Sequence, residues 1–155
     1  MRIAIGSDHA GFNLKNKIRD YLKKLGMECK DFGAYSMEPC DDYPYIAAAV
    51  GEAAASGGYQ GDILICGTGV GMSIVVNKIP GVRAALCNEL FSVKKSREHN
   101  NANILTIGSR MVGKELAKEI VSIWLTTEFM RGRHTQRVDK YRQIEKKYIH
   151  KSKCR

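Results

Sequence analysis

The decisive stretch of the sequence is Ile63-Leu-Ile-Cys-Gly-Thr-Gly-Val-Gly-Met-Ser73. Its apolar first part predicts a short strand that is buried on both faces, as in a parallel sheet. Glycines at 67, 69 and 71 predict a tight turn whose backbone amides are open to a ligand, because glycine has no Cβ. We expect a helix to begin near Val70, which places these amides at the positive end of a helix dipole. The stretch therefore indicates a thiol, Cys66, beside a group of anion-binding amides.

The spacing of the glycines excludes two well-known nucleotide motifs. A dinucleotide-binding G-x-G-x-x-G turn would need its third glycine at position 72, which is Met. A P-loop would need Gly-Lys-Ser/Thr after the turn, and this does not follow. A purely structural Cys66 also stays open at this point, since cysteine is among the residues most often buried.

Length and composition are those of one globular domain. The chain has 155 residues, of which 44% are hydrophobic and 26% charged, enough to bury a sizeable core. It shows neither a signal peptide nor an apolar run of about 18 residues, so we expect a cytoplasmic protein without membrane association. The five cysteines form no CxxC pair, which favours reduced thiols. The four histidines lack the spacing of metal ligands, so we expect no metal site.

Charge is concentrated at the C-terminus. The formal net charge is +9, of which residues 131–155 carry +8 with ten basic and two acidic side chains, so residues 1–130 are nearly neutral. A basic segment of this kind can bind nucleic acid, form a solvated helix face or clamp a phosphate. Because the sequence contains no nucleic-acid-binding motif, we do not expect nucleic acid as a partner. The alternative from another functional class is a nucleic-acid-binding module with a basic tail.

Apolar runs and helical stripes alternate along the chain. Strands are predicted at residues 2–7, 27–32, 62–66, 82–87 and 104–108. Helices are predicted between Gly11 and Gly26, from Tyr43 to about Gly57, from about Val70 to Lys78, from Glu89 to His99, from Glu115 to Phe129, and from Gln136 to about Tyr148. The buried face of the helix from Glu115 to Phe129 is predicted to carry Leu116, Ile120, Ile123 and Trp124. This alternation predicts an α/β fold in which helices cover both faces of a five-stranded parallel sheet.

Polar residues follow three of the predicted strands. Asp8 and His9 follow the first strand, the Cys66–Gly71 turn follows the third, and Arg110 follows the fifth. Ligands of parallel sheets bind beyond the carboxyl ends of the strands, which meet at one edge. We therefore expect these residues to converge on one site.

Four motifs, in order, resemble the type B ribose-5-phosphate isomerases, a family that also includes allose-6-phosphate and galactose-6-phosphate isomerase subunits. They are Gly6-Ser-Asp-His-Ala-Gly-Phe12, Gly67-Thr-Gly-Val-Gly-Met-Ser73, Ser96-Arg-Glu-His-Asn-Asn-Ala-Asn103 and Gly132-Arg-His-Thr-Gln-Arg137. The resemblance covers residues 1–148 as a single domain and leaves residues 149–155 as a basic tail. It implies a Rossmann-like three-layer α/β/α fold, a homodimer or homotetramer, and neither a metal nor an organic cofactor.

The activity that the resemblance implies is interconversion of D-ribose 5-phosphate and D-ribulose 5-phosphate, a step of the pentose phosphate pathway, through a cis-enediolate. Cys66 would be the base that removes the C2 proton, and we expect the following helix to favour its thiolate form. Backbone amides would stabilise the enediolate oxygen, and Thr68 would hold a hydroxyl or the developing charge. The amides concerned are those of Gly67, Thr68, Gly69, Val70 and Gly71. A hexose 6-phosphate, allose or galactose, is the alternative substrate.

The resemblance also assigns ring opening to His99 with Asp8 nearby, a hydroxyl contact to Asn100 and a substrate contact to Tyr43. Histidine suits ring opening because it exchanges protons near neutral pH. A helix-end His99 and a Tyr43 that only packs beside Pro44 are the structural alternatives.

Phosphate binding is assigned by the resemblance to several basic residues, with a site shared between subunits in which the region of residues 99–100 reaches the partner's Cys66 turn. The residues are His9, Arg110, Arg133 and Arg137, with His134 reaching the sugar or the phosphate. Arg133 and Arg137 are four residues apart, so a helix would point both guanidiniums the same way. A solvated basic face is the alternative interpretation of these arginines.

Overall fold

The computed structural model of the chain describes residues 1–38 and 42–152, without the side chains of residues 150–152. Its five strands form one parallel sheet in the order β2-β1-β3-β5-β4. The strands are β1 (Arg2–Ser7), β2 (Glu28–Asp31), β3 (Asp62–Cys66), β4 (Ala84–Leu86) and β5 (Ile104–Gly108). The helices are α1 (Phe12–Lys24), α2 (Tyr43–Ala55), α3 (Val70–Val76), α4 (Leu90–Asn100), α5 (Lys114–Thr126) and α6 (Arg133–Ser152). The predicted fold class is confirmed, and β2 and β4 are shorter than predicted.

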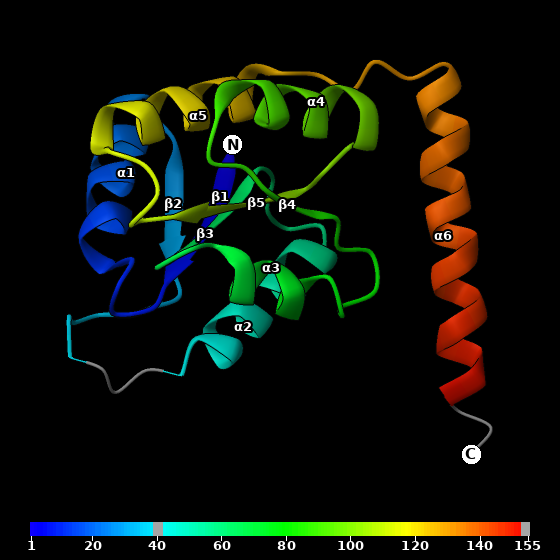
Figure 1. The fold of residues 1–155 in the computed structure, drawn as a ribbon, viewed down its shortest axis with the longest axis horizontal. Coiled ribbons are helices and arrows are strands. Elements are labelled where there is room, and N and C mark those ends of the chain that lie inside the picture. The colour runs from blue at the N-terminus through cyan, green and yellow to red at the C-terminus, as the bar shows by residue number, and fades with distance from the viewer. Residues whose placement is uncertain (39–41, 153–155) are drawn as a thin grey trace.

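Helices cover both faces of the sheet, which makes three layers (Figure 1). α1, α4 and α5 lie on one face, α2 and α3 lie on the other, and α6 stands beside this sandwich. None of the helices in the described part of the chain is long and apolar enough to cross a membrane.

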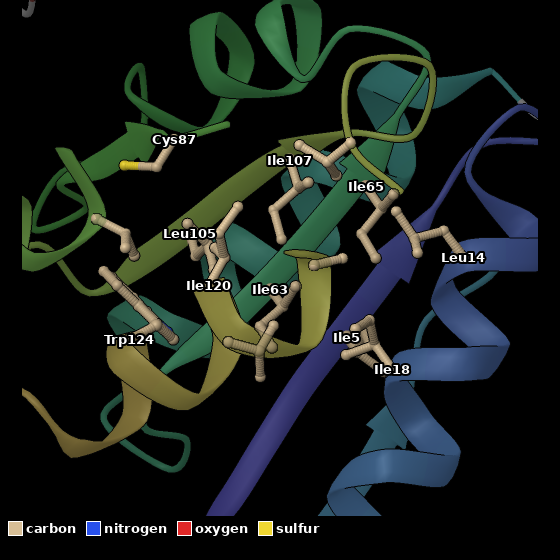
Figure 2. Close-up of a cluster of buried hydrophobic side chains, with 14 of the residues drawn as sticks. Ile5, Leu14, Ile18, Ile63, Ile65, Cys87, Leu105, Ile107, Ile120 and Trp124 are labelled. Carbon is tan, nitrogen blue, oxygen red and sulfur yellow. The ribbon is translucent and has the colours of Figure 1, made fainter. Parts of the chain in front are cut away.

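Alternate residues of the central strands supply two separate cores, because successive side chains of a strand point to opposite faces. Ile63 and Ile65 pack beneath α1 and α5 with Trp124, as Figure 2 shows. Leu64, between them, packs on the opposite face with Met72 of α3. β3 is buried along its whole length, as expected for a strand covered on both faces.

The buried face of α5 differs from the prediction. Ala117, Ile120, Val121 and Trp124 are buried, whereas Leu116 is 36% exposed. The buried residues follow the 3, 1, 3 spacing of a helical stripe, and Leu116 lies one position, or about 100°, away from it. The helix also ends at Thr126 rather than at Phe129.

The last helix is longer at both ends than predicted. Arg131 and Gly132 both have positive φ, and α6 begins directly after them, at Arg133. It continues to Ser152, so residues 149–152 of the predicted tail are helical. Residues 153–155 of that tail lie outside the described residues.

Candidate active site

A cleft of about 350 Å³ opens at the carboxyl ends of the central strands. It is lined by the last residue of β3, by residues that follow β1, β3 and β5, and by the first residue of α2. The lining residues are Asp8, His9, Ala10, Tyr43, Cys66, Gly67, Thr68, Gly71 and Arg110. The predicted convergence of polar residues at this edge is confirmed. We call this set the thiol cleft.

The Cys66 sulfur is held in a fixed position at the base of the thiol cleft. Cys66 is the last residue of β3 and is only 6% exposed. The Gly69 amide donates a hydrogen bond to Sγ at 3.1 Å, and the Cys66 carbonyl accepts one from the Ser109 amide at 2.8 Å. A donor aimed at the sulfur stabilises negative charge on it. The arrangement therefore presents the sulfur, with one donor aimed at it, to the cleft.

The turn after Cys66 requires glycine at two positions. Gly69 has a φ of +81°, and a Cβ there would overlap the Leu86 side chain. At Gly71 the obstacle is Tyr43, because a Cβ would lie 2.8 Å from its ring. Tyr43 therefore packs directly on the turn, on the side of the cleft formed by α2.

Fewer amides of the turn are open to a ligand than the sequence suggested. The Gly69 amide donates to Cys66, and the Val70 amide donates to Thr68 Oγ1 at 3.3 Å. The amides of Gly67 and Thr68 have no acceptor among the residues that the structure describes. The Gly71 amide, in the first turn of α3, has no acceptor among these residues either, so three of the five predicted amides are available as donors.

Asp8 and His9 form the wall contributed by β1. Asp8 is buried, and its Oδ1 accepts a hydrogen bond from the Gly11 amide at 2.8 Å. The His9 Nδ1 is buried and has no hydrogen-bond partner within the described part of the chain. Arg110 is exposed at the rim, with its guanidinium near Gly67, where an added Cβ would lie 3.6 Å away. The wall thus offers a carboxylate, an imidazole and a cation to one ligand.

The remaining predicted residues form a second group, which we call the histidine cluster. It consists of His99, Asn100, Arg133, His134 and Arg137. None of the five lines the thiol cleft. α4 starts after the carboxyl end of β4 and runs back to the amino end of β5. Its last residues, His99 and Asn100, therefore lie toward the amino ends of the strands, away from the thiol cleft. Eleven helical residues span about 16 Å, which separates the two groups within one chain.

The centre of the histidine cluster is a pair of stacked imidazoles. The ring centroids of His99 and His134 are 4.2 Å apart, and the ring planes differ by 3°. Burial lowers the pKa of His134, and the neighbouring His99, Arg133, Arg137 and Lys95 lower it further. His134 therefore favours its neutral form at neutral pH.

Several side chains that hold the site together had no signal in the sequence. Asn88 Oδ1 accepts from the Gly108 amide at 2.9 Å, and Ser109 Oγ donates to the Ala10 carbonyl at 2.8 Å. These contacts join segments that are 20 and 99 residues apart. The position of Asn88, just after β4, was the one feature that could have pointed to its role.

No group of His, Cys, Asp or Glu side chains suited to a metal ion occurs among the described residues.

Comparison with known proteins gives consistent results over nearly the whole chain. Residues 3–141 match the Ribose/Galactose Isomerase family. Ribose-5-phosphate isomerase B of Escherichia coli (strain K12) is 49% identical over 146 residues, which are 94% of this chain and 97% of that protein.

Two solved structures show the same similarity in three dimensions. Ribose-5-phosphate isomerase B of Clostridium thermocellum matches with a TM-score of 0.93 and 53% identity, over 96% of this chain and 99% of that one. The enzyme of the same name from Mycoplasma genitalium, solved with bound ribulose-5-phosphate, matches with a TM-score of 0.90 and 38% identity, over 94% and 96% of the two chains. The resemblance inferred from the four motifs is confirmed.

Proposed function

Since this chain belongs to the Ribose/Galactose Isomerase family, we propose that it interconverts D-ribose 5-phosphate and D-ribulose 5-phosphate, as its relatives' names indicate for them. It is a sugar-phosphate isomerase, and its proposed place is the pentose phosphate pathway. The observation that carries the proposal is the Cys66 sulfur, which faces the cleft beside the free amides of Gly67 and Thr68. A base and oxyanion donors next to each other are what the transfer of a proton between neighbouring carbons requires.

The proposed chemistry begins with the open-chain aldose. The Cys66 thiolate takes the proton from C2, the C–H electron pair forms the C1–C2 double bond, and the carbonyl electrons move to O1. The resulting enediolate oxygen is stabilised by the amides of Gly67 and Thr68, and donors of this kind contribute about 3 kcal/mol each in other enzymes. Return of the proton to C1, with transfer of the O2 proton to O1, gives the ketose.

Phosphate binding and ring opening draw on both groups of residues. His9 and Arg110 are the phosphate ligands that the thiol cleft contains, while Arg133 and Arg137 are exposed in the histidine cluster. A guanidinium fork matches a phosphate dianion. Ring opening is assigned to His99, with Asp8 beside the sugar.

The separation of the two groups leads us to propose a homodimer whose sites are shared. The histidine cluster of one subunit would complete the thiol cleft of its partner, and two such sites follow from a twofold axis. Apolar side chains left exposed on α3 and α6, among them Ile74 and Ile144, support a subunit contact. A tetramer built from such dimers is the alternative assembly.

The decisive assay is conversion of ribose 5-phosphate in the presence of a chelator. We expect ribulose 5-phosphate to form, and we expect Cys66→Ala to abolish turnover while inorganic phosphate still binds. Cys29→Ala, on β2, is the matched control and should retain activity, because Cys29 is half-buried and does not line the thiol cleft. Near-normal turnover by Cys66→Ala would exclude the proposed base. Conversion of hexose 6-phosphates alone would select the alternative substrate.

A further inference from the structure

The stacked imidazoles have an asymmetry that the proposed reaction does not use. His134 is 3% exposed, and its Nδ1 is buried without a hydrogen-bond partner in the described part of the chain. His99 is partly exposed and lies in the last turn of α4. A proton added to Nδ1 of His134 would become a buried N–H without an acceptor, which is costly. Protonation of the buried His134 ring is therefore disfavoured.

Charged groups around the pair come from both helices that contact it. α6 contributes Arg133 and Arg137, and α4 contributes Lys95, all of which act on His134 as positive charges. Glu98, an acid on α4, is paired with Lys95 at 2.8 Å and with Lys94 at 3.8 Å. The surroundings are therefore positive, and they oppose a second proton on the pair.

We propose that His134 is a positioning residue for His99: its buried ring fixes the plane of the His99 ring and limits the pair to one proton, which His99 exchanges with the sugar. The proposal rests on the proposed function, because it assigns His99 to the opening of the furanose. A fixed ring plane directs the His99 nitrogen along one line, and a hydrogen bond to the ring oxygen depends steeply on that direction. Two imidazolium rings at this separation repel each other, so the pair takes up its protons in two separate steps.

The geometric part of the proposal is tested by two substitutions that differ only in ring shape. His134→Phe keeps a flat ring of similar size, and we expect it to lose clearly less kcat than a variant without the ring. His134→Leu removes the flat surface, and we expect kcat to fall by roughly tenfold or more while KM changes less. Thr135→Ala, an exposed neighbour on the same turn of α6, is the control and should match the unaltered chain. Full activity in His134→Leu, or equal losses in both variants of His134, would overturn the positioning role.

The electrostatic part is tested by NMR titration of the histidine rings in the full chain. A merely structural role of His134 would not change the titration midpoints. Replacing His99 by Gln removes the neighbouring charge, so the midpoint of His134 should rise by roughly half a pH unit or more. An unchanged His134 midpoint would refute the coupling, whether or not the variant is active. If the unaltered chain failed to convert ribose 5-phosphate while the His134 midpoint still shifted, the proposed function would fail and the coupling would stand.

Discussion

The Tyr43 ring lies directly against the α-carbon of Gly71, so closely that a Cβ on residue 71 would come within 2.8 Å of it. This contact joins the start of α2 to the turn that carries the amides of the thiol cleft. A side chain at position 71 must displace the ring, the turn or both. The shape of the cleft therefore depends on glycine at a position where the backbone itself does not demand it, because Gly71 has no positive φ.

Gly71→Ala should lower kcat/KM by about tenfold, which corresponds to about 1.4 kcal/mol of transition-state stabilisation. The physical reason is displacement of Tyr43 from the wall of the thiol cleft. Steady-state kinetics with ribose 5-phosphate measures the effect. Gly113→Ala is the matched control, because a Cβ at residue 113 meets no atom within 4 Å and its φ is −75°. Equal kinetics for both variants would show that the Tyr43 contact does not shape the site.

Gly69→Ala should affect both stability and activity. Alanine in the left-handed region costs about 1 kcal/mol, and the overlap with Leu86 adds to this cost. Because the Gly69 amide is the donor to the Cys66 sulfur, we expect kcat to fall by roughly a hundredfold. Gly26→Ala has a similar φ, +73°, with open space around the added Cβ, and it should cost stability alone. Urea unfolding together with kinetics separates the two effects.

Asp62 should make the chain less stable as the pH rises from 4 to 7. Burial raises the pKa of this carboxyl to about 7, although a hydrogen bond from the Ala4 amide at 2.8 Å opposes the shift. The folded state therefore keeps a proton that the unfolded state releases near its ordinary value of 3.8. The stabilisation is complete below that value and is lost as the pH rises through about 7, at up to about 1.4 kcal/mol per pH unit.

Asp62→Asn checks the sign of this effect. Asparagine still offers Oδ1 to the Ala4 amide but has no proton to lose, so its free energy of unfolding should depend less on pH. Between pH 5 and pH 8 the unaltered chain should lose on the order of 2–3 kcal/mol relative to the variant in urea unfolding. Parallel pH profiles for the two chains would show that Asp62 does not titrate in this range.

Local patterns predicted the fold well, since they depend on neighbours in the sequence. β3 has the bounds that its apolar run suggested, and Gly26 ends α1 with the positive φ expected of a C-terminal glycine. The gathering of residues after β1, β3 and β5 was also predictable, because parallel strands align their carboxyl ends. The prediction of the buried face of α5 was wrong at Leu116, because a shift of one residue along the sequence moves an apolar side chain from the buried stripe of the helix to its neighbour.

Contacts between distant segments could not be predicted. Lys15 lies on the buried face of α1 with no exposed side-chain surface, and its Nζ is 2.7 Å from Asp31 Oδ1. A lysine is normally assigned to a solvated face, and nothing near it in sequence indicates a carboxylate 16 residues away. The stack of His99 on His134 is likewise a tertiary contact, formed because α6 begins beside the end of α4.

Lys15→Met should destabilise the chain by about 3 kcal/mol, since removing one partner of a buried ion pair leaves the Asp31 carboxylate less well compensated. Arg19, at 2.8 Å from Asp31 Oδ2, limits the loss because it remains as a second partner. Urea unfolding at pH 7 gives the value. Lys17→Met, on the exposed face of the same helix, is the control and should change stability by less than about 0.5 kcal/mol. Matching midpoints for the two variants would contradict a stabilising role of the buried pair.

Mixing two inactive variants tests whether the site is shared between subunits. Cys66→Ala removes the proposed base from the thiol cleft, and His99→Gln removes the proposed ring-opening group from the histidine cluster, so each alone should be inactive. If each site takes Cys66 from one subunit and His99 from the other, a mixed dimer has one intact site and one doubly altered site. Random exchange makes half of the dimers mixed, so activity should recover to about one quarter of that of the unaltered chain. Two affinity tags identify the mixed dimers, and mixed dimers that stay inactive would place the whole site within one chain.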